Sequence, residues 1–95
     1  MAAYVIADIE ITDAEKYTEY RDRVPATIET FGGRYLDRGG EVRVLEGEWT
    51  PNRVAVIEFE SAERALEWYS SEDYRPLIAI RRAASKSNLV LVKGV

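Results

Sequence analysis

Arginines that stand close to aromatic residues in the sequence are the side chains best suited to chemistry. An arginine offers a rigid fork of hydrogen-bond donors that matches a carboxylate or a phosphate. Aromatic rings beside it suit the flat or apolar body of a small ligand. The sequence therefore predicts a cleft for a small anionic or aromatic metabolite. The residues predicted to bind this ligand are Arg38, Trp68, Tyr74 and Arg81.

Three residues are candidates for moving a proton in such a cleft: Glu46, Glu58 and Tyr69. A carboxyl or phenol group acts as a general acid or base when its surroundings bring its pKa towards the working pH. The structural alternative is that Arg38 or Arg81 pairs with one of the two glutamates and holds a strand to a helix. Three classes of protein stay open: an enzyme, a ligand-sensing module without turnover, and a structural module that only dimerises.

A second group of acids belongs to two predicted strands and consists of Asp8, Glu10, Glu58 and Glu60. If these strands are neighbours, the carboxylates share one face of the sheet. Paired carboxylates can carry out acid–base chemistry or bind a hard cation such as Mg²⁺ or Ca²⁺. The alternative is that they keep the strand ends soluble, and we favour this alternative.

The chain contains neither cysteine nor histidine. Without cysteine there is no disulfide framework, no thiolate nucleophile and no cysteine metal site. Without histidine the commonest general base, the usual zinc ligand and the proximal haem ligand are missing. We therefore expect chemistry or binding without a metal or haem cofactor.

Length and charge narrow the class of protein further. The 95 residues fit one domain, residues 1–95, and the net charge is −4. Because no run of basic residues occurs, we expect no nucleic-acid partner. No apolar run approaches the roughly 20 residues that cross a bilayer, and no signal peptide is apparent, so we expect no membrane partner and a cytoplasmic location.

Hydrophobic periodicity predicts four strands. They cover residues 3–11, 34–38, 53–60 and 88–93, with the second resuming over Val42 to Glu46 after a bulge or bend at Gly39-Gly40. In the first and third strands apolar and polar side chains alternate, which places one face against a core.

Cap residues and apolar stripes predict three helices between these strands. Thr12 and Glu15 have the spacing of a capping box, Pro25 should kink or interrupt the first helix, and Gly32-Gly33 should end it. Ser61 caps the second helix, and Pro76 suits the first turn of the third.

The resulting order of elements is that of a ferredoxin-like βαββαβ sandwich, an α+β fold with a four-stranded antiparallel sheet. Helices would cover one face of the sheet. The other face carries aliphatic residues, which predicts a homodimer that packs through this open face.

Several short blocks carry a resemblance to a known family. They are Arg38-Gly39-Gly40, Leu45-Glu46-Gly47, Glu58-Phe59-x-Ser61, Trp68-Tyr69-Ser70-Ser71-Glu72-Asp73-Tyr74 and Arg81. Over nearly its whole length the chain resembles the small bacterial proteins of the domain of unknown function thirteen-thirty family. The resemblance implies a ferredoxin-like domain that dimerises into an α/β barrel. The wider superfamily includes proteins similar to cofactor-independent monooxygenases, muconolactone isomerases, haem-dependent peroxidases and ligand-sensing regulators, so the resemblance implies fold more strongly than chemistry. The sequence departs at residues 71–74, where the family usually has Ser-Pro-Glu-Tyr.

Overall fold

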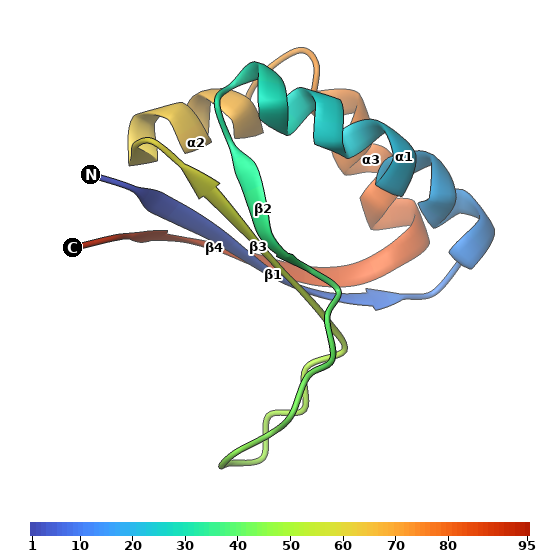
Figure 1. The fold of residues 1–95 in the computed structure, drawn as a ribbon. Coiled ribbons are helices and arrows are strands. Elements are labelled where there is room, and N and C mark those ends of the chain that lie inside the picture. The colour runs from blue at the N-terminus through green and yellow to red at the C-terminus, as the bar shows by residue number, and fades with distance from the viewer.

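Alternating side chains in the strands produce a sheet with one covered and one open face. The computed structural model describes residues 1–95, and its four strands form an antiparallel sheet in the order β2-β3-β1-β4 (Figure 1). The elements are β1 (Ala3–Ile11), α1 (Ala14–Thr30), β2 (Arg34–Arg38), β3 (Arg53–Phe59), α2 (Ala62–Tyr69), α3 (Arg75–Ala84) and β4 (Ser85–Lys93). All three helices lie on one face of the sheet. This arrangement confirms the predicted ferredoxin-like α+β fold.

The core lies between the sheet and the helices. The predicted inward faces of β1 and β3 are buried at Val5, Ala7, Ile9, Ala55, Ile57 and Phe59. The apolar stripe of α1 packs on them through Tyr17, Tyr20, Val24 and Ile28. Two large aromatic side chains, Trp68 and Tyr74, are completely buried with ring centroids 4.0 Å apart. None of the helices is long and apolar enough to cross a membrane.

The start of α1 differs from the prediction by one residue. Asp13, and not Thr12, caps the helix, because the Asp13 carboxylate accepts a hydrogen bond from the backbone N–H of Lys16 at 3.1 Å. The backbone N–H of Thr12 instead donates to the carbonyl of Ala84 at 2.8 Å. The backbone N–H of Asp13 donates to the same carbonyl at 3.1 Å, so both residues before α1 are tied to the end of α3.

Pro25 was predicted to kink or interrupt the first helix, and the interruption does not occur. The helix α1 continues from Ala14 to Thr30 with Pro25 inside it. Proline has no N–H group to donate to the carbonyl four residues earlier, which belongs to Arg21. The guanidinium of Arg38 on β2 donates to that carbonyl instead, so the missing hydrogen bond is replaced from outside the helix.

Two strand predictions also need correction. Val42 to Glu46 is not a strand: residues 39–52, here called the arm, leave the sheet between β2 and β3 and project beyond its open face (Figure 1). No neighbouring strand reaches this segment, so it has no ladder to join. At the other end of the chain, β4 begins at Ser85 and not at Asn88, because Ser85 already pairs with Ile11 of β1.

Candidate functional site

A small cavity lies between α1 and the helix-covered face of the sheet. Its polar lining comes from three tyrosines and three arginines: Tyr17, Tyr20, Tyr35, Arg21, Arg38 and Arg53. Trp68 and aliphatic side chains complete the wall. The cavity volume is about 20 Å³, which is close to the room that one water molecule needs. Three arginines and several aromatic rings thus meet in this cavity.

A bulge in β2 brings two of these residues to the same side of the sheet. The register between β2 and β3 shifts between Tyr35 and Asp37, so Leu36 is the extra residue. Tyr35 then pairs with Ile57, and Arg38 with Ala55, both on the inward face of β3. In a regular strand, residues three apart point to opposite faces. The bulge therefore explains why Tyr35 and Arg38 both face the cavity.

A glycine next to the bulge makes room for the second arginine. Gly39 has a φ of +74°, and a Cβ atom at this position would lie 2.6 Å from Cζ of Arg53. The Arg53 guanidinium therefore packs where any other residue would place its side chain. Arg53 lies on the inward face of β3 with Ala55 and Ile57, so it enters the cavity beside Arg38.

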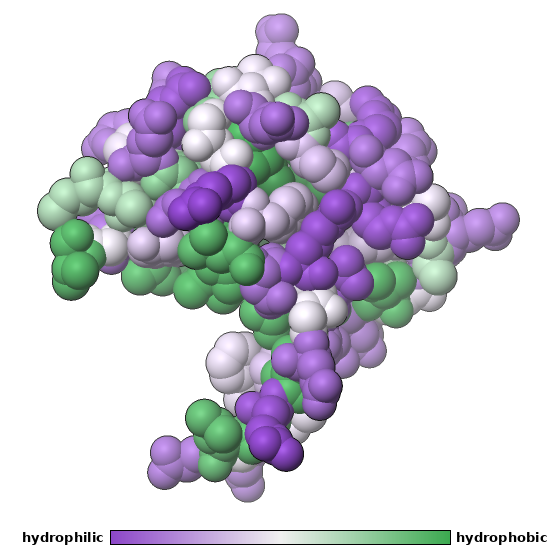
Figure 2. Space-filling model, in the orientation of Figure 1, coloured by the Kyte–Doolittle hydropathy of each residue, from purple (hydrophilic) through white to green (hydrophobic).

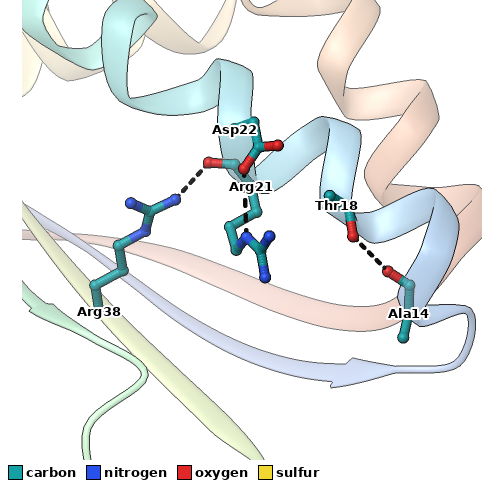
Figure 3. Close-up of polar contacts among 5 residues, drawn as sticks. All are labelled: Ala14, Thr18, Arg21, Asp22 and Arg38. Atoms are coloured by element: carbon teal, nitrogen blue, oxygen red, sulfur yellow. Dashed lines mark hydrogen bonds and ion pairs between the residues drawn. The ribbon is translucent and has the colours of Figure 1, made fainter.

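Arg38 connects the sheet to α1 across the mouth of the cavity. Its guanidinium lies 5.0 Å from the ring centroid of Tyr35 and donates to the carbonyl oxygen of Arg21. Figure 3 shows this side chain reaching from β2 to the helix, while the side chain of Arg21 binds Asp22 at 3.4 Å. The Arg38 side chain is exposed to solvent. It is held by one backbone carbonyl and not by an acid.

A buried chain of hydrogen bonds lies behind the cavity. Tyr20 lines the cavity, and its hydroxyl is 2.8 Å from the Tyr74 hydroxyl. The Tyr74 hydroxyl also accepts a hydrogen bond from Nη1 of Arg81 at 2.6 Å, and Nε of Arg81 donates to Ser87 at 3.1 Å. Only 3 % of Arg81 is exposed. Hydroxyl groups thus bind this buried guanidinium, and no carboxylate forms an ion pair with it.

Three arginines of the site have no acidic partner. The four ion pairs of the structure involve Arg21, Arg23, Arg34 and Arg64, so Arg38, Arg53 and Arg81 have no acidic partner within 4.0 Å. The alternative prediction that Arg38 or Arg81 pairs with Glu46 or Glu58 is therefore wrong. Buried positive charge is costly unless a negative group compensates it. Arg81 is the fully buried one of the three and lies behind the cavity, whereas Arg38 and Arg53 line the cavity and would contact an anion placed there.

Tyr17, Tyr35 and Tyr74 have raised pKa values and are neutral at ordinary pH. Burial raises the pKa of Tyr35 to about 12, and repulsion from Tyr20 adds to this effect. Burial and the neighbouring Tyr20 also raise the pKa values of Tyr17 and Tyr74. For Arg81, burial opposes the charged form, but Tyr74 and Tyr20 outweigh it and its pKa is raised. The cavity therefore presents phenol hydroxyls and guanidinium ions, and no ready general base.

The residues predicted to bind a ligand fall into two layers. Arg38 and Trp68 line the cavity, and Trp68 is held in place by a hydrogen bond from its ring N–H to the Thr27 hydroxyl at 3.0 Å. Tyr74 and Arg81 lie one layer further in and reach the cavity through Tyr20. The structure thus brings all four predicted residues into one region.

The three residues predicted to move a proton lie outside the cavity. Glu46 is in the arm and exposed, and Glu58 is on the open face of the sheet, where Nε of Arg34 donates to it at 2.8 Å. Tyr69 lines a separate apolar groove between α2 and β4. The structure does not bring these side chains together.

The acids of the first and third strands do not form a pair. β1 and β3 are neighbours as expected, but Asp8 pairs with Val54, and Glu58 with Tyr4. Four residues of strand separate the two acids, roughly 13 Å. Asp8 accepts hydrogen bonds from the Trp49 ring N–H at 3.2 Å and the Asn52 backbone N–H at 2.9 Å, so it anchors the arm. No cluster of three acidic, histidine or cysteine side chains suited to a metal ion occurs.

Five polar residues of the cavity lining are absent from the sequence-based prediction: Tyr17, Tyr20, Tyr35, Arg21 and Arg53. The two helix tyrosines are buried, which by itself also fits a role in core packing. For Arg53 a signal was present, because the alternation of β3 places it on the same face as Ala55, Ile57 and Phe59. A charged residue on the buried face of a strand is rare unless a partner or a ligand compensates it.

Comparison with known proteins gives a family and a fold. Residues 2–95 match the family model described as Domain of unknown function (DUF1330). No curated protein matches the chain. Among solved structures, a protein of unknown function from Rhodopseudomonas palustris is similar with a TM-score of 0.81 and 20 % identity, covering 99 % of this chain and 82 % of that one.

Two further solved structures share the fold at lower identity. SnoaB, a cofactor-independent oxygenase from Streptomyces nogalater, has a TM-score of 0.64 and 14 % identity over 99 % of this chain and 92 % of its own. A putative antibiotic biosynthesis monooxygenase from Nitrosomonas europaea has a TM-score of 0.61 and 13 % identity, with 99 % and 90 % covered. At these identities the likeness shows the fold alone.

Proposed function

The chain belongs to the DUF1330 family, and we propose that its cavity binds a small anionic or aromatic metabolite without a metal or haem cofactor. The protein would bind or convert this metabolite as a homodimer. One observation carries the proposal: Arg38 and Arg53 converge on a tyrosine-lined cavity, and neither has an acidic partner. A guanidinium pair is suited to a carboxylate, an enolate or a phenolate.

The present cavity volume of about 20 Å³ requires the mouth to open before a metabolite enters. Arg38 is the side chain placed to allow this, because it is exposed and a single backbone carbonyl holds its guanidinium. An anion offers Arg38 a stronger, charge-assisted hydrogen bond than the neutral carbonyl does. The ligand itself would therefore favour the open position of Arg38.

The same groups favour the deprotonated form of a bound phenol or enol. An adjacent positive charge lowers the pKa of an acid because it stabilises the anion. The neutral tyrosine hydroxyls can donate hydrogen bonds to that anion. SnoaB is described as a cofactor-independent oxygenase, and a cavity that stabilises an organic anion is compatible with such chemistry. It is equally compatible with a ligand sensor that carries out no turnover.

The homodimer proposal rests on the open face of the sheet. Its central positions are aliphatic, and the β1–β3 and β1–β4 registers place Ile6, Val54, Val56, Val90 and Val92 on it. Val90 is 55 % and Val92 45 % exposed. A continuous apolar surface of this kind is typical of an interface, and a second copy offers an identical face. A structural module that only dimerises is the alternative function.

A thermal-shift screen with small carboxylates and phenols tests the cavity. We expect at least one compound to raise the melting temperature of the wild-type protein, since a ligand that binds only the folded state stabilises it. Arg53→Gln should abolish that shift. Arg43→Gln removes the same charge from the arm and should preserve it. Shifts of equal size in all three proteins, or in none, would contradict the proposal.

Turnover of the compound found in this screen separates an enzyme from a sensor. Light scattering tests the dimer, which should have twice the 10.8 kDa mass of the chain. A monomeric mass at micromolar concentration would contradict the homodimer and leave the cavity proposal standing.

A further inference from the structure

The arm carries apolar side chains that nothing in the chain covers. Leu45 is 91 %, Trp49 67 %, Val44 43 % and Val42 36 % exposed. Figures 1 and 2 show the arm projecting away from the body beyond the open face, with apolar residues along it and an apolar underside of the body beside it. The body holds the arm near its base through Asp8, which binds Trp49 and Asn52. A lone chain thus exposes an apolar segment to water.

The backbone of residues 41–51 is also free to pair, because within the arm only Gly39, Gly40 and Asn52 donate backbone hydrogen bonds. Residues 40–52 take part in no backbone–backbone hydrogen bond. An unpaired segment of this kind resembles the peptides that add to the edge of a sheet, where main-chain bonds give affinity and side-chain pockets give specificity. The arm therefore needs an exposed sheet edge with an apolar pocket beside it.

Such an edge exists on the opposite side of the sheet. β4 is an edge strand, since the sheet order is β2-β3-β1-β4. Beside it lies a groove of about 300 Å³ between α2 and β4, lined only by hydrophobic residues: Val5, Ala65, Leu66, Tyr69, Leu89, Val90 and Leu91. Leu66 is 57 % exposed in this groove. The groove has room for aliphatic side chains of the kind that the arm carries.

The charges of the arm and of β4 are complementary. The arm has three acids, Glu41, Glu46 and Glu48, against the single base Arg43. β4 has two bases, Lys86 and Lys93, and no acid, with its exposed apolar residues between them. Opposite charges of this kind steer two surfaces together and fix their register.

We propose that the arm of one copy docks into the groove between α2 and β4 of a second copy, and that the second copy reciprocates. The inference rests on the homodimer proposed above and specifies how it is built. A chain cannot fill its own groove, because the arm leaves the β2–β3 edge and the groove lies at the opposite edge. When two sheets pack face to face about a twofold axis along the strands, the β2 edge of one copy lies over the β4 edge of the other. Each arm then lies beside its partner's groove, as an isologous interface requires.

Site-specific crosslinking tests this arrangement directly, because the natural chain contains no cysteine. We would prepare Leu45→Cys in the arm, Leu66→Cys in the groove and Arg82→Cys on the exposed side of α3 as separate proteins. After subunit exchange, a short bis-maleimide should join Leu45→Cys to Leu66→Cys in high yield. Leu45→Cys mixed with Arg82→Cys should give only background.

A charge swap gives a second readout that needs no cysteine. Glu46→Lys with Glu48→Lys should raise the dimer dissociation constant at least about tenfold, which corresponds to 1.4 kcal/mol. Adding Lys86→Glu and Lys93→Glu to the same chain should restore it. A dimer with wild-type affinity in every variant and no arm-to-groove crosslink would overturn the arm exchange alone. A wild-type protein that stays monomeric would overturn both the arm exchange and the homodimer.

Discussion

The Tyr74 hydroxyl is the junction of the buried hydrogen-bond chain, so Tyr74→Phe should destabilise the protein strongly. The hydroxyl contacts Nη1 of Arg81 at 2.6 Å and the Tyr20 hydroxyl at 2.8 Å. The exposed fractions of Tyr74, Arg81 and Tyr20 are 0 %, 3 % and 6 %. Leaving a buried polar group without its partner costs about 1–3 kcal/mol, and more when the group is charged. Two groups lose a partner here, so we expect a loss of about 2–4 kcal/mol in the free energy of unfolding.

Urea unfolding followed by circular dichroism measures this loss, which is a large part of the roughly 5–15 kcal/mol that stabilises a domain. Tyr4→Phe is the matched control. Tyr4 is half-buried on the open face of the sheet, outside the buried chain, and its change should stay within about 0.5 kcal/mol. Equal effects of the two substitutions would refute the assignment of Tyr74 as the junction.

Arg81→Met tests, by the same urea unfolding, what the buried charge of Arg81 contributes to stability. This substitution removes the guanidinium and leaves the Tyr74–Tyr20 hydrogen bond in place. A buried charge without an acidic partner carries a desolvation cost, and replacing it with an apolar side chain of similar length recovers part of that cost. We therefore expect Arg81→Met to cost less stability than Tyr74→Phe. The opposite order would mean that the hydrogen bonds from Arg81 to Tyr74 and Ser87 more than offset the cost of burying its charge.

Three further changes test the parts that position the cavity. Pro25→Ala restores an N–H group that can donate to the Arg21 carbonyl. Arg38→Gln should therefore lower the free energy of unfolding by about 1 kcal/mol less in the Pro25→Ala protein than in the wild-type protein. A double-mutant cycle measured by urea unfolding gives this coupling. Gly39→Ala should destabilise the protein by about 1–2 kcal/mol, because residue 39 has a left-handed φ of +74° and its new Cβ would meet Arg53. An unchanged urea midpoint would contradict this expectation. The pKa of Tyr35 is raised in the folded state from 10.0 to about 12, so its contribution to stability is complete below pH 10 and is lost as the pH rises towards about 12. Tyr35→Phe should reduce that alkaline slope in an unfolding series, and an identical slope would contradict the assignment.

The fold was predictable because its signals are local. Alternation along β3, the Ser61 cap, the Gly32-Gly33 stop and Pro76 in the first turn of α3 each depend on residues a few positions apart. The errors lie where contacts with residues distant in the sequence determine the local structure. The arm looks extended in sequence because Val42 and Val44 alternate with charged residues, but a strand requires a neighbour that the arm does not have within its own chain.

The cavity was harder to predict because the pairing of the strands determines which side chains line it. Sequence spacing identified Arg38 and Trp68, which line the cavity. It did not show that a bulge at Leu36 turns Arg38 inward, since a one-residue shift reverses the face of every later side chain in the strand. Nor did it connect Arg53 with Arg38, because the arm of fourteen residues, 39–52, separates them in the sequence.

Two local irregularities meet at the mouth of the cavity, and their combination favours a ligand site over a scaffold. Pro25 leaves a helix carbonyl without a donor, and the bulge at Leu36 places Arg38 where it can supply one. Scaffolding alone would account for that single contact. It does not account for Arg53, which enters the same space from the next strand without an acidic partner and needs a glycine at residue 39 to do so. Departures from regular structure that serve no packing purpose concentrate at functional sites. A second unpaired guanidinium therefore points to a negative group that arrives from outside the chain.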